Sequence, residues 1–316
     1  MAWRFEPGEK LQSAFRRVAT EEIAKVRAGL LGDADGHARA VHEARQGFKR
    51  LRAMARLARH ALGKDFEAEN ARWRDVGKLL SGLRDQHVLM ESFEKAVAGC
   101  GDPLPADAAE YLRQRLRAET APPDADGKDK EAEVLRRLEA AETDMAVLAW
   151  PRNDAALLAG LKGSQARLRR SWKRARKSVA PADLHRWRKR VKDQAAQLRL
   201  FRGVEPEALR ILRADAKEAA ECLGEEHDLW ILSDSLRAQT CPAEVTAARD
   251  ALIDAIETRR DELRTKAFAL GEKFSSQDAK AFAEAVCSAW AKGPASKKSR
   301  RKKVRPAKAP VTSQPK

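Results

Sequence analysis

Two segments of the sequence each place a histidine at the head of a row of basic side chains. In the first segment, His42 is followed by Arg45, Lys49, Arg52 and Arg56. In the second, His185 is followed by Arg188, Lys192 and Arg199. Most of these residues are three or four positions apart, which keeps the side chains on one face of a helix. Such a face is suited to binding phosphate, because arginine donates paired hydrogen bonds to its oxygens and lysine supplies a compact charge.

The two segments are related by a constant offset of 143 positions. The offset aligns His42 with His185 and continues downstream, where Asp85 aligns with Asp228. Each aspartate therefore follows its histidine by 43 residues. An offset that is kept over this length indicates an internal duplication.

The basic rows carry few compensating acids. Only Glu43 interrupts the first row between His42 and Arg59, and residues 167–192 hold twelve Lys or Arg against the single acid Asp183. Like charges four residues apart cost an isolated helix roughly 0.2–0.5 kcal/mol per pair. Two neighbouring helices of this kind would repel each other unless an anion lay between them, so the pattern favours an anion site. A basic face exposed to solvent is the alternative.

The histidines and the aspartates allow more than one interpretation. A single histidine on a helix is commonly packed or hydrogen-bonded, but two at matching positions favour anion binding. With an ordinary pKa near 6.5, they predict tighter binding at pH 6 than at pH 8. We interpret Asp85 and Asp228 as structural residues that orient cations or hold a helix end by a salt bridge. Trp172 and Trp187 lie in basic stretches, where core packing and base stacking are both open.

The elements that position these residues are expected to be helices. Ala, Leu, Arg and Glu dominate the composition, and runs of alternating β-branched residues are absent. The apolar spacing predicts helices over residues 11–30, 38–62, 66–97, 106–118, 131–148, 154–177, 181–201, 206–239, 242–269 and 278–290. The third of these is expected to bend near Ser81 and Gly82. Long helices with short connections predict an all-α fold in which each half is an antiparallel bundle.

Composition limits the classes of protein and partner. A hydrophobic content of 43% indicates a folding chain, and a net charge of +16 favours polyanionic partners. Residues 293–316 contain nine Lys or Arg without an acid or apolar periodicity, so they are expected to form a disordered basic tail. The four cysteines are scattered, which predicts no zinc site, and no cofactor is expected. No signal peptide or membrane span is evident, so we expect a cytoplasmic protein.

The duplicated motifs resemble those of the CHAD domain, the conserved histidine α-helical domain. The resemblance rests on His42-x-x-Arg45-x-x-x-Lys49 and His185-x-x-Arg188-x-x-x-Lys192, each followed by its aspartate. Residues 83–89, which include Arg84 and Asp85, are similar to a second signature of the family. The counterpart of that signature around Asp228 lacks the arginine, and Ala195 replaces the counterpart of Arg52. The two halves are therefore not expected to bind equally.

The resemblance implies two tandem four-helix bundles related by an internal pseudo-twofold repeat, with a basic groove or pore between them. It places the domain at residues 1–292, with halves at about 1–148 and 152–292. It also implies binding of inorganic polyphosphate and association with polyphosphate granules and their proteins. The residues that it assigns to binding are His42, Arg45, Lys49, Arg52, Arg56, Lys173, Arg174, Arg176, His185, Arg188, Lys192 and Arg199.

Three functions remain to be compared. The preferred hypothesis is a non-enzymatic polyphosphate-binding protein, because a continuous row of cations fits a polymer that has no bases. A nucleic-acid-binding protein that uses the basic tail is the alternative. An enzyme is disfavoured, because the sequence has no Gly-x-x-x-x-Gly-Lys loop for a nucleotide and no carboxylate cluster for magnesium.

Overall fold

The computed structural model describes residues 3–32, 37–80, 82–119 and 127–293. Within these ranges the regular structure is entirely helical, which confirms the predicted all-α class. The elements are α1 (Leu11–Leu30), α2 (His37–Leu57), α3 (Arg59–Leu62), the 3-10 helix η2 (Gly63–Asp65), α4 (Phe66–Leu79), α5 (Gly82–Ala98), α6 (Ala106–Glu119), α7 (Gly127–Val147), α8 (Asp154–Ser178), α9 (Pro181–Leu200), α10 (Glu207–Ala238), α11 (Ala243–Ser275) and α12 (Ala279–Lys292).

Most predicted helix limits agree with the structure to within a few residues. The predicted helix 38–62 is divided into α2 and α3, and the predicted helix 66–97 is divided into α4 and α5. Helix α11 continues to Ser275, past the predicted end at residue 269. It passes through Gly271, where an added Cβ would lie 2.6 Å from Cζ2 of Trp187. Packing of the Trp187 ring on this glycine therefore outweighs the low helix propensity of glycine.

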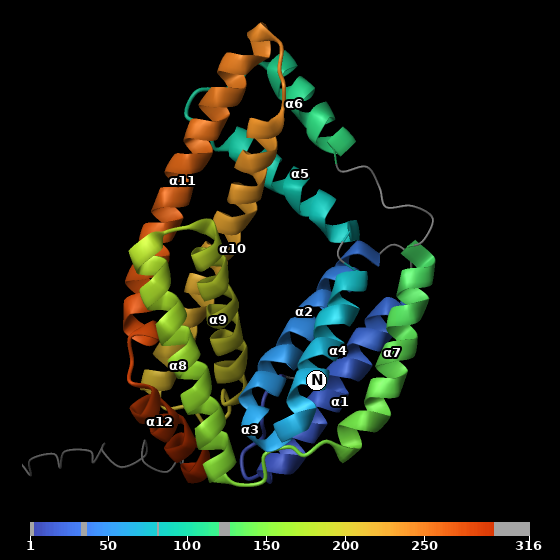
Figure 1. The fold of residues 1–316 in the computed structure, drawn as a ribbon, viewed down its shortest axis with the longest axis vertical. Coiled ribbons are helices and arrows are strands. Elements are labelled where there is room, and N and C mark those ends of the chain that lie inside the picture. Colours follow the sequence, from blue (N-terminus) through green and yellow to red (C-terminus); the bar gives the residue numbers. More distant parts are fainter. Residues whose placement is uncertain (1–2, 33–36, 81, 120–126, 294–316) are drawn as a thin grey trace, which may run out of the picture.

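The helices form two groups that are joined at α2 and α9 (Figure 1). In one group, α1 packs against α2 and α7, and α4 packs against α2 and α7. In the other, α9 packs against α8 and α10, and α10 packs against α11. Helix α12 covers α8. A chain reversal of a few residues connects α8 to α9, so these two basic helices lie side by side and antiparallel.

The two hydrophobic cores do not follow the division of the sequence into halves. Leu89 and Phe93 of α5 are buried in the same core as residues of α8 to α11, together with Leu112 of α6. In Figure 1, α5 and α6 cross to the upper parts of α10 and α11. Conversely, Phe282 of α12 belongs to the core of α1, α2, α4 and α7. The predicted halves therefore exchange elements, and their description as two tandem bundles stays a prediction.

Buried amides fix α9 against α2 and α8. Nε2 of Gln197 donates to the backbone oxygen of Ala53 at 2.8 Å and to Oγ of Ser164 at 3.2 Å. Nε2 of Gln194 donates to Gln165, whose own amide donates to the oxygen of Phe274 at 2.8 Å. Buried polar groups need such partners, and a hydrogen-bonded set allows few alternative registers. The network thus holds two cation-bearing helices in a fixed relative position.

Helix α8 approaches the end of α2 at a glycine. A Cβ added at Gly160 would lie 1.9 Å from the carbonyl oxygen of Leu57, the last residue of α2. Only glycine allows this backbone contact, which brings the start of α8 against the end of α2.

Candidate functional site: a basic cavity

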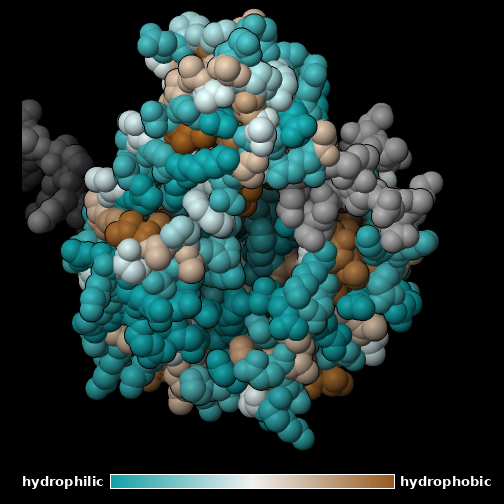
Figure 2. All heavy atoms as spheres, turned by 45° about the horizontal axis from the view of Figure 1, so that its top comes forward, coloured by the Kyte–Doolittle hydropathy of each residue, from teal (hydrophilic) through white to brown (hydrophobic). Residues whose placement is uncertain are grey.

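A cavity of about 1150 Å³ is lined by residues of α2, α5, α9, α10 and α11. Figure 2 shows hydrophilic residues around a hollow near the middle of the molecular face. The lining includes eleven Lys or Arg against five Asp or Glu. The cations are Arg45, Lys49, Arg50, Arg52, Arg56, Lys95, Arg188, Lys189, Lys192, Lys217 and Arg259. The cavity is therefore strongly basic and attracts anions.

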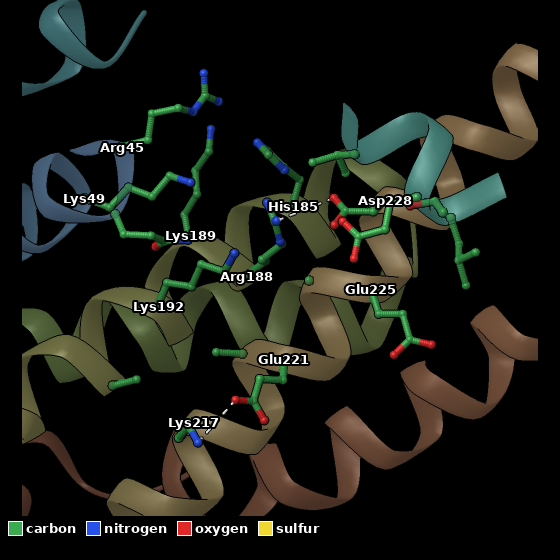
Figure 3. A pocket seen from close by; sticks show the side chains of 18 of the residues that line it. Arg45, Lys49, His185, Arg188, Lys189, Lys192, Lys217, Glu221, Glu225 and Asp228 are labelled. Carbon is green, nitrogen blue, oxygen red and sulfur yellow. Dashed lines mark ion pairs between the residues drawn. The ribbon is translucent and has the colours of Figure 1, made fainter. Parts of the chain in front are cut away.

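Seven of the twelve residues that were predicted to bind line this cavity. They are Arg45, Lys49, Arg52 and Arg56 from α2 and His185, Arg188 and Lys192 from α9. Figure 3 shows that the ends of Lys49 and Lys192 point toward the same space from different helices. The structure thus brings together the two rows that the sequence separates by more than a hundred residues.

The α9 side of the cavity holds cations away from water. Burial and the nearby charges of Arg188 and Lys49 together lower the pKa of Lys192 to about 7, while Asp228 opposes them. Burial also lowers the pKa of Arg188. Among the described residues, Nε of Arg188 is buried without a hydrogen-bond partner. These shifts show that the charged forms are held at a cost, which an anion in the cavity would offset.

The α2 side repeats this pattern. Burial and the neighbouring Arg56 lower the pKa of Arg52 to about 10, and Nε of Arg52 is buried without a hydrogen-bond partner. Arg45 donates to the carbonyl oxygen of Leu80 at 2.8 Å, at the C-terminal end of α4. That bond satisfies a terminal helix carbonyl and places the guanidinium at the edge of the cavity.

Each acid in the cavity lining is paired with a cation. Glu91 is 2.8 Å from Lys95, Glu221 is 3.4 Å from Lys217, and Glu225 is 2.9 Å from Arg259. Asp193 is 2.6 Å from Arg56, and Asp228 is 3.9 Å from Arg188. Figure 3 shows Glu221 and Glu225 on α10, separate from the lysines of α9. The excess of positive charge is therefore concentrated along α2 and α9.

The expectation of an ordinary pKa near 6.5 is wrong for His185 in the free protein. Burial, together with the nearby charges of Lys189, Arg188 and Lys192, lowers its pKa to about 4. Its ring lies 4.5 Å from that of His227, which in turn stacks on Trp230 at 5.6 Å. Burial and the charge of Arg188 lower the pKa of His227 to about 3. His185 is therefore neutral at pH 6, and Lys192 is the cavity residue that titrates near neutrality.

The other five predicted residues do not line the cavity. Lys173, Arg174 and Arg176 are exposed on α8, where Arg174 is 2.8 Å from Asp183 and Arg176 is 2.7 Å from Glu272. Arg199 is exposed near the end of α9, and partial burial and the charge of Arg50 lower its pKa. His42 is half-buried one turn before Arg45. The structure thus separates these five residues from the seven that it brings together.

Sequence reasoning missed several cations of the cavity. Lys189 follows His185 by four residues and precedes Lys192 by three, so helical spacing alone could have identified it. Arg50 lines the cavity but is engaged by Glu22 at 2.9 Å. Lys95, Lys217 and Arg259 come from α5, α10 and α11, and no motif in the sequence marks them.

Some of the predictions concern parts that the structure does not describe. The side chains of Arg84 and Asp85, and the basic tail beyond residue 293, lie outside the described residues. Within the described part of the chain, no group of three or more His, Cys, Asp or Glu could hold a metal ion. Among the helices described, none is long and apolar enough to cross a membrane.

Comparison with known proteins identifies the family. The family model of the CHAD domain matches residues 11–237, from the start of α1 almost to the end of α10. No curated protein matches the chain. The matched region includes every residue that was predicted to bind.

Proposed function

Because the chain belongs to the CHAD domain family, we propose that it binds inorganic polyphosphate in the basic cavity between α2 and α9. The residues proposed to contact the polymer are Arg45, Lys49, Arg52, Arg188, Lys189 and Lys192. Polyphosphate is a flexible chain with dense negative charge and no bases. Its receptor needs closely spaced cations and no device for reading a sequence.

The observation that carries this proposal is that two cation-rich helices, α2 and α9, line one cavity. Lys192 is destabilised in its charged form by Lys49, and Lys189 by burial and then by Arg52. A phosphate bound between these cations would attract each of them and offset their repulsion. Each guanidinium of Arg52 and Arg188 can also donate to a phosphate through more than one nitrogen.

The polymer suits the cavity better than nucleic acid does. Trp172 and Trp187, which were considered as stacking platforms for bases, are 4% and 0% exposed in the core. Binding of single-stranded nucleic acid relies on exposed aromatic faces as well as on charge. We therefore propose that nucleic acid competes poorly with polyphosphate.

We also propose that the protein binds the polymer without cleaving it. The five carboxylates of the cavity lining are each engaged by a lysine or an arginine. We interpret each carboxylate as balancing the charge of a cation rather than holding magnesium. Incubation with polyphosphate and magnesium is expected to release no inorganic phosphate above a protein-free control.

The test compares two double variants with the same loss of charge. Lys49→Gln/Lys192→Gln removes one cation from each helix of the cavity, while Lys280→Gln/Lys292→Gln removes two exposed cations from α12. We expect the first variant to weaken binding of fluorescent long-chain polyphosphate by about 100-fold, and the second by about twofold or less. Circular dichroism would confirm unchanged helicity.

Equal loss of affinity in the two double variants would contradict the cavity as the binding site. Competition by duplex DNA at the same phosphate concentration as polyphosphate would support the nucleic-acid alternative. Association with polyphosphate granules in the cytoplasm is a further part of the proposal. A fluorescent fusion that stays diffuse in cells that contain polyphosphate granules would contradict it.

A further inference from the structure

A largely buried ion pair lies where the cavity meets a small polar pocket. Nη1 of Arg56 donates to Oδ1 of Asp193 at 2.6 Å, and Nη1 of Arg190 donates to Oδ2 at 3.1 Å. Arg56 and Asp193 line both the large cavity and a small polar pocket behind it. Arg167 and Arg190 line only the small pocket. The carboxylate therefore stands at the boundary between cations that face the cavity and cations that do not.

Asp193 compensates more than its two hydrogen-bonded partners. Burial and nearby arginines lower the pKa of Arg52 and of Arg167 to about 10, and at both residues Asp193 acts in the opposite direction. A single carboxylate thus serves four guanidinium groups. Its two oxygens accept hydrogen bonds from two arginines, as the oxygens of a phosphate would.

The other acids of the cavity lining are in different surroundings. The side chain of Asp193 is 11% exposed, whereas those of Glu91, Glu225 and Asp228 are 45%, 48% and 35% exposed. An exposed pair exchanges its partners readily with water, but a buried pair that loses one partner leaves an uncompensated charge. Asp193 is therefore the cavity carboxylate with the largest influence on nearby cations.

We propose that Asp193 is a built-in counter-anion that closes this end of the cavity to phosphate and limits the affinity for the polymer. The inference rests on the proposed function and adds the inner boundary of the same site. Asp193 occupies a donor of Arg56, the partner that faces the cavity, and this donor would otherwise bind phosphate oxygens. Neutralising Asp193 removes the charge that holds Arg56, so its guanidinium can pair with the polymer in the cavity instead.

The experiment measures the affinity for long-chain polyphosphate and the thermal midpoint with and without the polymer. Asp193→Asn is expected to lower the midpoint of the free protein, because four arginines lose their shared anion. It is also expected to tighten polyphosphate binding by about tenfold and to increase the stabilisation that the polymer gives. Asp250→Asn, which removes an exposed acid of α11 outside the cavity, is the control for net charge.

A second pair of variants covers the case in which Asp193→Asn does not fold. Arg190→Gln removes one of the competing arginines, and Arg190→Gln/Asp193→Asn has the net charge of the natural protein. The double variant is expected to bind polyphosphate more tightly than Arg190→Gln alone, because Arg56 is released in it.

The outcomes separate this inference from the proposed function. Absence of polyphosphate binding by the natural protein and by the Asp193 variants would overturn both. Binding by the natural protein that neither substitution of Asp193 tightens would overturn the inference alone. An equal gain from Asp250→Asn would also overturn it, because the effect would then come from net charge.

Discussion

The cavity face of α2 and α9 and the outer face of α8 are both rich in cations, yet their environments differ. Lys192 in the cavity is largely buried, and its pKa is lowered to about 7 by burial and by the nearby Arg188 and Lys49. Lys173 on α8 is exposed, and its neighbours Arg174 and Arg176 are each paired with an acid. The charged form of a basic residue is therefore destabilised in the cavity, whereas basic residues on α8 are solvated or paired with acids.

The difference shows that the number of cations in a segment is a weak guide to anion affinity. On a convex exposed helix, water and mobile ions screen each charge within about 10 Å at ordinary salt. In a cavity shared by two helices, the charges act on one another through a medium of lower effective permittivity. An anion gains most where the protein has already excluded water, and the following predictions test that distinction.

The largest expected effect comes from reversing the charge of one lysine in each region. Lys192→Glu is expected to weaken polyphosphate binding by more than about 100-fold, because it places a carboxylate among the cations that face the polymer. Lys173→Glu, with the same change on α8, is expected to weaken binding by about twofold. Fluorescence anisotropy with labelled polyphosphate would measure both. Similar losses in the two variants would remove the distinction between the regions.

Lys192→Glu should also change stability in an unusual direction. Because the pKa of Lys192 is lowered from 10.5 to about 7, this lysine is protonated in the unfolded chain but largely neutral in the folded protein between these two pH values. Stability therefore rises with pH across this window, and the destabilising contribution of Lys192 is fully present below pH 7. Replacing the cation is expected to raise the thermal midpoint at pH 6, as measured by calorimetry without polymer. A fall in the midpoint would contradict the repulsion assigned to this residue.

Salt should affect binding next most strongly. If about four cations of the cavity contact phosphates, raising the salt from ~50 to ~200 mM is expected to weaken binding roughly 50-fold, by analogy with single-stranded nucleic acid. Each lost contact reduces the logarithmic slope by about 0.7. The slope of Lys49→Gln/Lys192→Gln should therefore be shallower than that of the natural protein, and the slope of Lys173→Gln should not. An unchanged slope in the cavity variant would place its lysines outside the contact surface.

A smaller effect of pH on polyphosphate affinity is expected. It distinguishes the cavity from the exposed face of α8, because it depends on the burial of Lys192. Protonated Lys192 binds an anion better than neutral Lys192, so affinity should rise as the pH falls through about 7. Binding is expected to be about tenfold tighter at pH 6 than at pH 8 if the polymer raises this pKa well above 8. Lys192→Arg should flatten the profile, since arginine stays charged. His185→Gln should retain it, because burial keeps His185 neutral at pH 6 and His185 is not among the residues proposed to contact the polymer.

How much of the site could be predicted depends on which interaction fixes each residue. The spacing of Arg45, Lys49 and Arg52 marks one helix face, and α2 presents that face to the cavity. No local pattern indicates that Lys217 and Arg259 join them, because their positions follow from the packing of α10 on α9 and α11. The lowered pKa of His185 could not be predicted from the sequence either, since it arises from burial and from cations that the fold brings near.

The helices were easier to predict than their interruptions and their partners. Periodic apolar residues predict α1 and α9 almost to the residue. The end of α2 at Leu57 was missed, because the close approach of Gly160 there involves a residue about a hundred positions away. For the same reason, the sequence did not show that Phe93 joins the core of α8 to α11. Local propensity cannot report contacts between distant segments.

The smallest expected effect comes from a substitution on the exposed face of α8. Arg176 pairs with Glu272 at 2.7 Å and lies over the ring of Trp172, 4.9 Å from its centroid. The side chains of Arg176 and Glu272 are exposed, so Arg176→Gln is expected to lower the free energy of unfolding by only about 0.5–1 kcal/mol. Polyphosphate affinity should change by about twofold or less, because solvent already screens this charge. Urea unfolding and a binding titration would check the two values. A tenfold loss of affinity with unchanged stability would show that the polymer continues from the cavity onto α8. A loss caused by damage to the fold would lower the stability as well.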